Sequence, residues 1–359
     1  MRPYFGDEEK KALSKYDYSE GFLTEFKYTQ DLEAALCERL SVNYCVMVNN
    51  GTIALTIAAL ACEIKAGDEV IMPNFTMIAT PNSIKLLGAI PVFCDVEKES
   101  LCLDINEMKS KITNKTKAVI LVNSNGRYPN YNVDELRIYL NEQNIFLIED
   151  SAQALGSLYS DNVPIGNKSN IATLSFSAPK IISTGQGGAV FTNDKLVYEK
   201  VKRLKDFGRL SGGDDIHDYF GINCKFTDLQ AIIGLTQLKK LNKRIEIRKQ
   251  QHGFYTKSLA NICSVEVINN DLKYTCPWFS EVLVEKRDEL MTFLKNNGVG
   301  TRAMYPPINL QKIYNFDGLY PVSHDIGNRG LWLPSHMGVK EKDIIFISSL
   351  INDFYESNK

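Results

Sequence analysis

The stretch Phe146-Leu147-Ile148-Glu149-Asp150-Ser151-Ala152-Gln153 decides the fold expected for this chain of 359 residues. Its apolar run ends directly in two carboxylates, as a strand does when both faces of its sheet are covered. Similar runs recur and alternate with segments of helical period. They predict strands at 44–48, 69–72, 90–96, 118–122, 145–148, 171–176 and 188–192, and helices at 52–61, 106–111, 132–142 and 195–205. This alternation predicts an α/β fold with a mostly parallel, seven-stranded sheet.

The pattern changes after a long basic helix that we expect at 227–252. Strands at 265–268, 279–284 and 301–305, with helices at 288–297 and 341–355, have the order of a smaller α+β domain. We therefore expect a large domain at 1–245, which includes an N-terminal arm, and a small C-terminal domain at 246–359.

The composition excludes several classes of protein. With 41 basic and 43 acidic residues, the net charge of −2 argues against a nucleic-acid or polybasic membrane surface. The longest apolar run, near residues 51–62, is shorter than the ~20 residues that cross a bilayer, and the first residues are too charged for a signal peptide. These features predict a cytoplasmic protein. The eight cysteines and four histidines show no metal-ligand spacing, so we expect no metal site.

The segment Asn49-Asn50-Gly51-Thr52-Ile53-Ala54-Leu55 follows a strand and opens a helix. A glycine at such a turn lets another group approach the backbone closely, and the free N–H groups of a first helical turn attract an anion. The segment is therefore a candidate phosphate site. A plain strand–helix turn with Thr52 as the helix cap is the alternative.

An acid and a lysine follow at two other strand ends. Burial of Glu149 or Asp150 is costly without a partner. One interpretation is that one of the two acids caps a helix. The functional interpretation is that Asp150 meets a cation in the cleft. Lys180 comes shortly after a strand and before the glycine-rich segment 185–188. Most lysines are solvated, but a desolvated lysine at a strand end loses its proton and forms Schiff bases.

An anion site, then an acid, then a lysine is the order expected for an enzyme that uses pyridoxal 5'-phosphate (PLP). This cofactor needs a cradle for its phosphate, a carboxylate for its pyridinium nitrogen and a lysine for a Schiff base. The carboxylate keeps the ring nitrogen protonated, so that the ring accepts electrons from a substrate carbanion.

The chain resembles the DegT/DnrJ/EryC1/StrS family of nucleotide-sugar aminotransferases, which have the fold-type-I architecture of aspartate aminotransferase. The resemblance runs from Arg2-Pro3-Tyr4-Phe5-Gly6 to the C-terminal helix. It is most specific at Asp150–Gln153, at Ser175-Phe176-x-x-x-Lys180 and at Gly185-Gln186-Gly187-Gly188. It implies that Lys180 is the catalytic residue, which binds PLP covalently and then moves protons between the cofactor and the sugar carbon.

The resemblance also implies the other contacts of the site. Asp150 would pair with the pyridine nitrogen, and Gln153 would lie beside the ring hydroxyl. Asn223 would reach the phosphate from the neighbouring subunit of a homodimer, so that the active site is shared. Lys225 matches a frequently basic position on the nucleotide-sugar side. The remaining phosphate contacts would come from Thr52, the backbone N–H of Ile53 and the hydroxyl of Ser175.

Several residues near the expected sugar pocket depart from the family pattern. Met77 stands where an aromatic ring usually covers the cofactor, although a thioether can also cover a ring face. Asn123-Ser124-Asn125-Gly126-Arg127 replaces a histidine-containing strand end that precedes a Tyr-Gly pair. In the segment 301–309, where we expect Tyr305 to contact the substrate, Asn309 occupies a position at which histidine is common.

Lys180 favours transamination, because the dehydratases of the family carry histidine at this position. The run Lys180–Gln186 resembles the group that aminates sugar C-4, which includes perosamine and viosamine synthases. We expect L-glutamate to convert PLP to pyridoxamine phosphate, which then aminates C-4 of a nucleotide-linked 4-keto-6-deoxyhexose. Amination of C-3 in a 3-keto-6-deoxy sugar is the alternative reaction. A relative without catalysis, which binds the cofactor as a regulatory or scaffold module, is the alternative outside enzymes.

Overall fold

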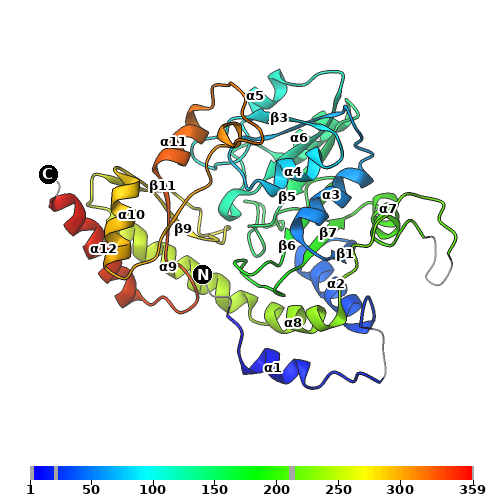
Figure 1. Cartoon of the computed structure of the whole chain (residues 1–359), viewed down its shortest axis with the longest axis horizontal. Helices are drawn as coiled ribbons and strands as arrows, with labels where there is room; N and C mark the ends of the chain where they lie inside the picture. The colour runs from blue at the N-terminus through cyan, green and yellow to red at the C-terminus, as the bar shows by residue number, and fades with distance from the viewer. Residues whose placement is uncertain (1–3, 20–22, 210–214, 358–359) are drawn as a thin grey trace.

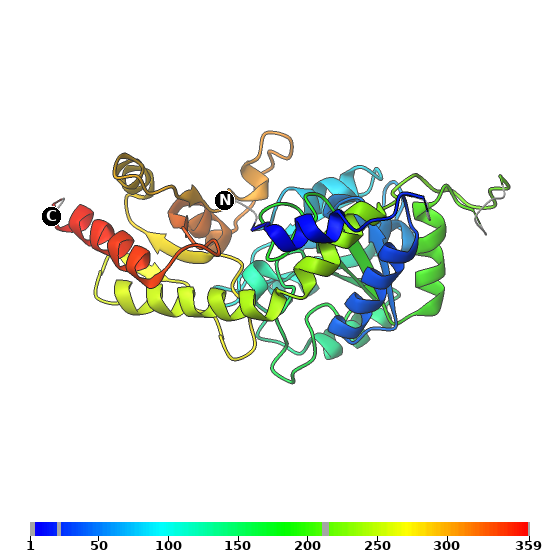
Figure 2. The same ribbon diagram turned by 90° about the horizontal axis from the view of Figure 1, so that it is seen from below.

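The computed structural model describes residues 4–19, 23–209 and 215–357 (Figures 1 and 2). Arg2 and Pro3, at the start of the family resemblance, lie outside the described residues. The first sheet consists of β1 (Tyr44–Val48), β2 (Glu69–Pro73), β3 (Ile90–Cys94), β4 (Thr116–Val122), β5 (Phe146–Asp150), β6 (Ile171–Ser175) and β7 (Gly188–Thr192). All seven expected strands are therefore confirmed, with ends that differ by a few residues.

Helices cover both faces of this sheet. They are α1 (Asp7–Leu13), α2 (Lys27–Leu40), α3 (Gly51–Ala61), α4 (Ala79–Lys85), α5 (Ile105–Ser110), α6 (Val133–Asn141), α7 (Lys195–Lys205) and α8 (Asp228–Leu238). On β1, Val46 and Val48 pack with α3 and α7, whereas Cys45 and Met47 pack with α2 and α8. Successive side chains of a strand point to opposite faces, so one apolar strand feeds two cores. The four helices expected in this part are confirmed as α3, α5, α6 and α7. Their ends differ from the expected ones by no more than two residues.

The sheet is mostly parallel, as expected. Its strand order is β1-β7-β6-β5-β4-β2-β3, and β7 alone runs antiparallel to its neighbours β1 and β6. The carboxyl ends of β1, β5 and β6 therefore lie along one edge, where α/β sheets bind ligands. This topology brings the candidate phosphate, acid and lysine segments to the same edge.

A second, four-stranded sheet follows, with the order β10-β11-β9-β8, and all its pairs are antiparallel. The strands are β8 (Val265–Val267), β9 (Ser280–Val284), β10 (Arg302–Ala303) and β11 (Gly330–Leu333). The helices of this part are α9 (Leu241–Leu259), α10 (Arg287–Asn296), α11 (Pro321–Arg329) and α12 (Glu341–Glu356). Figure 1 shows α9 running from the large sheet to the second one, and the expected boundary at residue 245 falls inside this helix.

Two expectations about this region are wrong. The basic helix at 227–252 is two helices, because the chain turns at Lys239–Lys240 before Leu241 enters the core at the start of α9. The strand at 301–305 is reduced to Arg302–Ala303, because Pro306 and Pro307 follow and a proline has no N–H for a sheet hydrogen bond. Among the described residues, no helix combines the length and apolar character that a bilayer crossing requires.

Candidate active site

The start of α3 lies against the ends of two strands. A Cβ atom on Gly51 would be 2.8 Å from Ser175 Cβ, and one on Gly188 would be 2.4 Å from the Asn50 carbonyl oxygen. Glycine is therefore required at both positions for the helix to approach β6 and β7 so closely. Asn50 caps the helix, since its Oδ1 accepts the Ile53 N–H at 2.9 Å, and the alternative with Thr52 as the cap is wrong.

This approach brings together the residues expected at a phosphate. Thr52 is the second residue of α3, so its backbone N–H belongs to the first turn, where amides have no acceptor within the helix. The Ser175 Oγ lies at the end of β6, 3.3 Å from Ser177 Oγ. The Ile53 N–H is engaged by Asn50, so it can donate to another acceptor only if the Asn50 side chain turns away. Glycine, backbone amides and a hydroxyl form an anion cradle.

The two carboxylates that end β5 point to opposite faces of the sheet, as strand geometry requires. Asp150 is buried and accepts hydrogen bonds from Thr80 Oγ1, at 2.8 Å, and from the Ala152 N–H, at 3.2 Å. Burial raises the pKa of Asp150, and the Thr80 hydrogen bond and the charge of Lys180 oppose this rise. Lys180 is therefore close enough to Asp150 for its charge to act on this carboxyl group.

Glu149 takes no part in this site. Its Oε2 accepts the Tyr159 hydroxyl and the Gly166 N–H, the latter at 3.1 Å, and burial raises its pKa to about 7. The interpretation of Glu149 as a helix cap is not what the structure shows. Of the two adjacent acids, Asp150 is the one on which the charge of Lys180 acts, and Glu149 is engaged by Tyr159 and Gly166.

Lys180 lies in the loop between β6 and β7, where its backbone N–H donates to the Ser177 carbonyl at 3.0 Å. Burial lowers the pKa of Lys180 to about 8, although the charge of Asp150 acts in the opposite direction. A small cavity is lined by Lys180, Gln153 and Ser175 together with Ala152, Leu155, Ile181, Cys276 and Trp278. A lysine with an accessible neutral form thus shares one cavity with residues expected at the ring and at the phosphate.

Gln153 is held by a turn that also contacts the second sheet. The Gln153 Oε1 accepts the Asn125 N–H at 2.7 Å, and Asn125 has a left-handed backbone with φ of 52°. The Asn125 amide then pairs with both backbone groups of Phe279, at 2.6 and 3.0 Å. The departure at 123–127 is therefore a link between the candidate cofactor site and the residue that precedes β9.

The same turn carries a buried ion pair. Arg127 Nη1 lies 2.7 Å from Glu281 Oε2, and both side chains are nearly inaccessible. The Arg127 Nε also donates to the Asn269 carbonyl at 2.9 Å, and Trp332 Nε1 donates to the second Glu281 oxygen at 2.9 Å. Because the partners of the Arg127 and Glu281 side chains outside the pair belong to the segment 268–332, the pair fixes the large domain against the second sheet.

Tyr305, expected at the substrate, and Met77, expected over the cofactor, lie in different environments. The Tyr305 ring packs edge-on against Trp332, and burial raises its pKa, to which the nearby charge of Asp150 adds. Met77 is exposed, and its Sδ accepts the Ala79 N–H at the start of α4, the helix that carries Thr80 to Asp150.

Asn309 is buried, and its Oδ1 and backbone N–H are engaged by protein groups. Its Oδ1 accepts the Asn74 amide at 2.8 Å, its N–H donates to Asn74 Oδ1 at 2.9 Å, and His324 Nε2 lies 3.1 Å from the same Oδ1. The Asn309 side chain therefore holds its segment to the end of β2.

Asn223 and Lys225 lie at the end of the connection between α7 and α8. Asn223 is exposed, and its Oδ1 accepts the Lys225 N–H at 3.2 Å, while Lys225 Nζ pairs with Asp206 at 2.8 Å. The Asn49 N–H donates to the Cys224 carbonyl at 3.2 Å, so this segment borders the turn that opens α3. The described parts of the connection project from the body of the chain (Figure 2).

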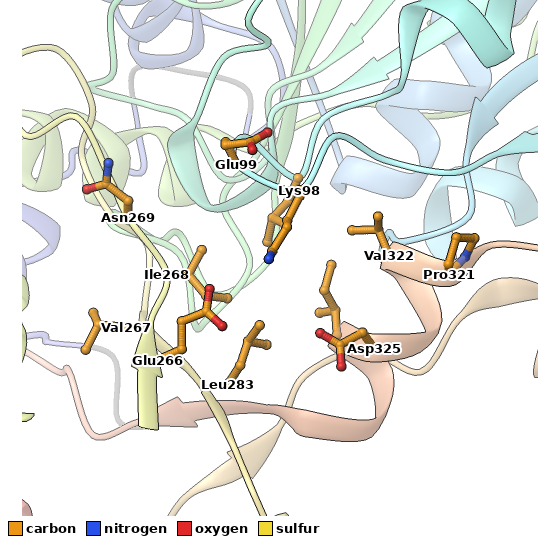
Figure 3. Close-up of a pocket in the computed structure, with 12 residues that line it drawn as sticks. Lys98, Glu99, Glu266, Val267, Ile268, Asn269, Leu283, Pro321, Val322 and Asp325 are labelled. Atoms are coloured by element: carbon orange, nitrogen blue, oxygen red, sulfur yellow. The ribbon is translucent and has the colours of Figure 1, made fainter. Parts of the chain in front are cut away.

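Roomier cavities lie elsewhere, and two of them border the second sheet. One, of about 520 Å³, is formed by the 98–101 loop, β8 and α11, and Figure 3 shows Lys98, Glu99, Glu266 and Asp325 around it. The other, of about 710 Å³, lies between Arg302 and α12. Neither contains Asp150, Lys180 or a residue of the anion cradle.

Sequence reasoning missed two residues of the site. Thr80 donates a hydrogen bond to Asp150 from α4. The sequence did not predict this helix, because Thr80 and Pro81 are poor helix formers. Trp278 lines the Lys180 cavity from the segment before β9. A signal existed for Trp278, since the chain has only two tryptophans.

The chain is similar to known proteins along nearly its whole length. A GDP-perosamine synthase of Escherichia coli O157:H7 is 34% identical over 358 residues, which covers 99% of this chain and 97% of the relative. A dTDP-4-amino-4,6-dideoxy-D-glucose transaminase of Shigella dysenteriae is 31% identical, with 90% and 89% of the two chains covered. The crystal structure of a DegT DnrJ EryC1 StrS aminotransferase from Brucella abortus matches with a TM-score of 0.89 and 28% identity, over 97% of this chain and 95% of that chain.

These matches confirm the fold-type-I aminotransferase architecture expected for the chain. The model of the DegT/DnrJ/EryC1/StrS aminotransferase family matches residues 3–351, from the N-terminal arm to the last helix. The match includes the anion cradle, Asp150 and Lys180. The chain therefore belongs to the DegT/DnrJ/EryC1/StrS aminotransferase family.

Proposed function

We propose that this chain is a PLP-dependent aminotransferase that transfers the amino group of L-glutamate to C-4 of a nucleotide-linked 4-keto-6-deoxyhexose. The observation that carries the proposal is the environment of the partly buried Lys180, which lines one cavity with Gln153 and Ser175. Burial lowers the pKa of Lys180 to about 8, and the negative charge of Asp150 acts on the lysine in the opposite direction. Family membership supports transamination. The similarity to a GDP-perosamine synthase and to a dTDP-4-amino sugar transaminase supports C-4 and favours a GDP- or dTDP-linked substrate.

The residues present fit PLP. Its phosphate needs backbone amides and hydroxyl groups that lie close together. Gly51 and Gly188 have no Cβ to prevent this close approach, and they form such a cradle with Ser175. Its pyridinium needs a buried carboxylate, and Asp150 is buried with Lys180 as the cation that acts on it. When bound, PLP supplies an electron-accepting ring and a carbonyl carbon that a lysine amine can attack.

The side chains of this chain divide the work. Asp150, held by Thr80, would keep the ring nitrogen protonated, because a buried carboxylate is stabilised by a cation beside it and in turn favours the protonated form of that nitrogen. In each half of the reaction, the neutral Lys180 amine would take a proton from one reacting carbon, and its protonated form would then deliver that proton to the other reacting carbon, so that the free amine is regenerated. Gln153, fixed by Asn125, would orient the ring hydroxyl.

A homodimer with shared active sites is part of the proposal. Asn223 is exposed at the end of the connection between α7 and α8, and its Oδ1 accepts the Lys225 N–H at 3.2 Å. An amide placed there can reach the phosphate of a neighbouring copy. Exposed aromatic side chains on the same segment, Phe207, Tyr219 and Phe220, support contact with a second copy.

The test is a panel of GDP-, dTDP- and UDP-linked 4-keto and 3-keto sugars with L-glutamate, followed by NMR assignment of the new amine. We expect a product aminated at C-4 from wild type and none from Lys180→Ala. The replacement Lys257→Ala, at an exposed lysine on α9, is the control and should retain activity. Amination at C-3 would overturn the position of transfer, and an active, coloured Lys180→Ala would overturn the mechanism.

Subunit mixing tests the shared site. Lys180→Ala and Asn223→Ala are each expected to be impaired, but a mixed dimer contains one site with both wild-type residues if Asn223 acts across subunits. Unfolding and refolding an equal mixture should then restore about a quarter of wild-type activity, because half of the dimers are mixed and each has one intact site. No recovery would place Asn223 in the site of its own chain.

A further inference from the structure

The amine of Lys180 lies on an indole ring. Its Nζ is 4.1 Å from the centroid of the Trp278 ring, within the range of a cation–π contact. Trp278 is buried, and its Nε1 donates to the Pro179 carbonyl at 2.8 Å. One side chain thus contacts both the end of the lysine and the backbone immediately before it.

The indole is itself fixed from two sides. The Phe279 ring lies 4.1 Å from it, centroid to centroid, and the Trp332 ring lies 5.9 Å away. Phe279 is paired through its backbone with Asn125 of the large domain, and Trp332 is hydrogen-bonded to Glu281. Because these contacts come from both sheets, the ring forms a rigid surface beside the lysine loop.

In the proposed reaction, Lys180 alternates between a covalent bond to the cofactor and a free amine. A free lysine side chain has about 2 kcal/mol of rotamer entropy, so an unsupported amine would leave the reacting carbon between steps. An aromatic face attracts the ammonium form without forming a salt bridge that would keep the proton. A surface of this kind holds the amine and still allows the proton to be given back.

We infer that Trp278 is a positioning residue for Lys180: its indole face holds the free amine in the cavity, and its N–H fixes the loop at Pro179. The inference rests on the proposed function of Lys180, but the contact itself exists without cofactor. Its first test therefore uses the apoprotein.

The first test compares Trp278→Leu and Trp278→Phe, with Trp332→Phe as a matched control at a neighbouring ring. The reaction of Lys180 with an amine-modifying reagent is followed by peptide mass spectrometry at about pH 7.5. We expect Lys180 to react about three- to tenfold faster in Trp278→Leu, because loss of the ring destabilises the ammonium and frees the amine. Trp278→Phe and Trp332→Phe should stay within about twofold of wild type. Equal rates in wild type and Trp278→Leu would overturn the inference.

A second measurement does not require Trp278→Leu to fold. In Trp332→Phe, Trp278 is the sole remaining tryptophan, since the chain has two. Its emission should change as the amine titrates, because an ammonium against the ring alters the excited state, and the change should disappear when Lys180→Met is added. Emission that follows the same pH curve with and without Lys180 contradicts the contact.

The loaded enzyme distinguishes the inference from the proposed function. Trp278→Leu should lower kcat by about tenfold or more and leave the KM for glutamate nearly unchanged, since the ring acts on the lysine and not on substrate binding. If wild type binds no PLP at Lys180 while the apoprotein results hold, the proposed function is wrong and the contact remains. If wild type transaminates and Trp278→Leu matches it in kcat, the positioning role is wrong.

Discussion

Replacing Lys180 by methionine should change the pH dependence of apoprotein stability in a defined direction. Burial lowers the pKa of Lys180 from 10.5 to about 8 in the folded protein. Between these two values the unfolded chain binds more protons than the folded one, so the free energy of unfolding of wild type rises with pH. Methionine has a similar length and carries no proton, so the variant lacks this rise.

The magnitude follows from the two pKa values. Each unit of difference corresponds to about 1.4 kcal/mol, and integration from about pH 7 to about pH 9.5 gives about 2 kcal/mol in favour of wild type. The Lys180 side chain is only partly buried, so solvent screening reduces this to about 1–2 kcal/mol. Other titrating groups are common to both proteins and cancel in the difference.

The assay is urea unfolding of both apoproteins at these two pH values and at one protein concentration. The free energy of unfolding of wild type minus that of Lys180→Met should increase as the pH rises. Lys257→Met, at an exposed position on α9, should show no such shift. If this difference in free energy stays constant between the two pH values, or decreases, the interpretation of Lys180 as a desolvated lysine is refuted.

Three further predictions concern the frame of the site. Gly51→Ala places a Cβ 2.8 Å from Ser175 Cβ, so it should weaken PLP binding about tenfold or more in a cofactor titration, and cost about 1–3 kcal/mol in urea unfolding. Arg127→Met leaves Glu281 buried without its partner and should cost about 3–5 kcal/mol, part of which the additional change Glu281→Met should recover. Asp150→Asn should lower kcat by about 100-fold or more in steady-state assays, with little change in the melting temperature of the apoprotein.

The sequence by itself determined the architecture of the large domain. A strand that is covered on both faces needs continuous apolar residues, so the run at 146–148 and its counterparts were visible without knowledge of their neighbours. The same local logic marked Glu149, Asp150 and Lys180 as candidates, because a charge at or shortly after the end of a buried strand requires a reason, and the family resemblance then favoured Asp150 and Lys180. The break at Lys239–Lys240 was not visible, since both residues are good helix formers and the turn depends on the entry of Leu241 into the core.

Tertiary structure alone decided which side chains complete the site. Strand alternation places Glu149 and Asp150 on opposite faces of the sheet. Only the hydrogen bond from Thr80 of α4 to Asp150, and that from Tyr159 to Glu149, show which of the two acids belongs to the candidate site. The family pattern at Asn309 indicated a substrate contact, whereas its pairing with Asn74, 235 residues away, engages the amide within the protein. Trp278 meets Lys180 across the two sheets, and no local pattern encodes such a contact, because it depends on how two separately folded cores pack together.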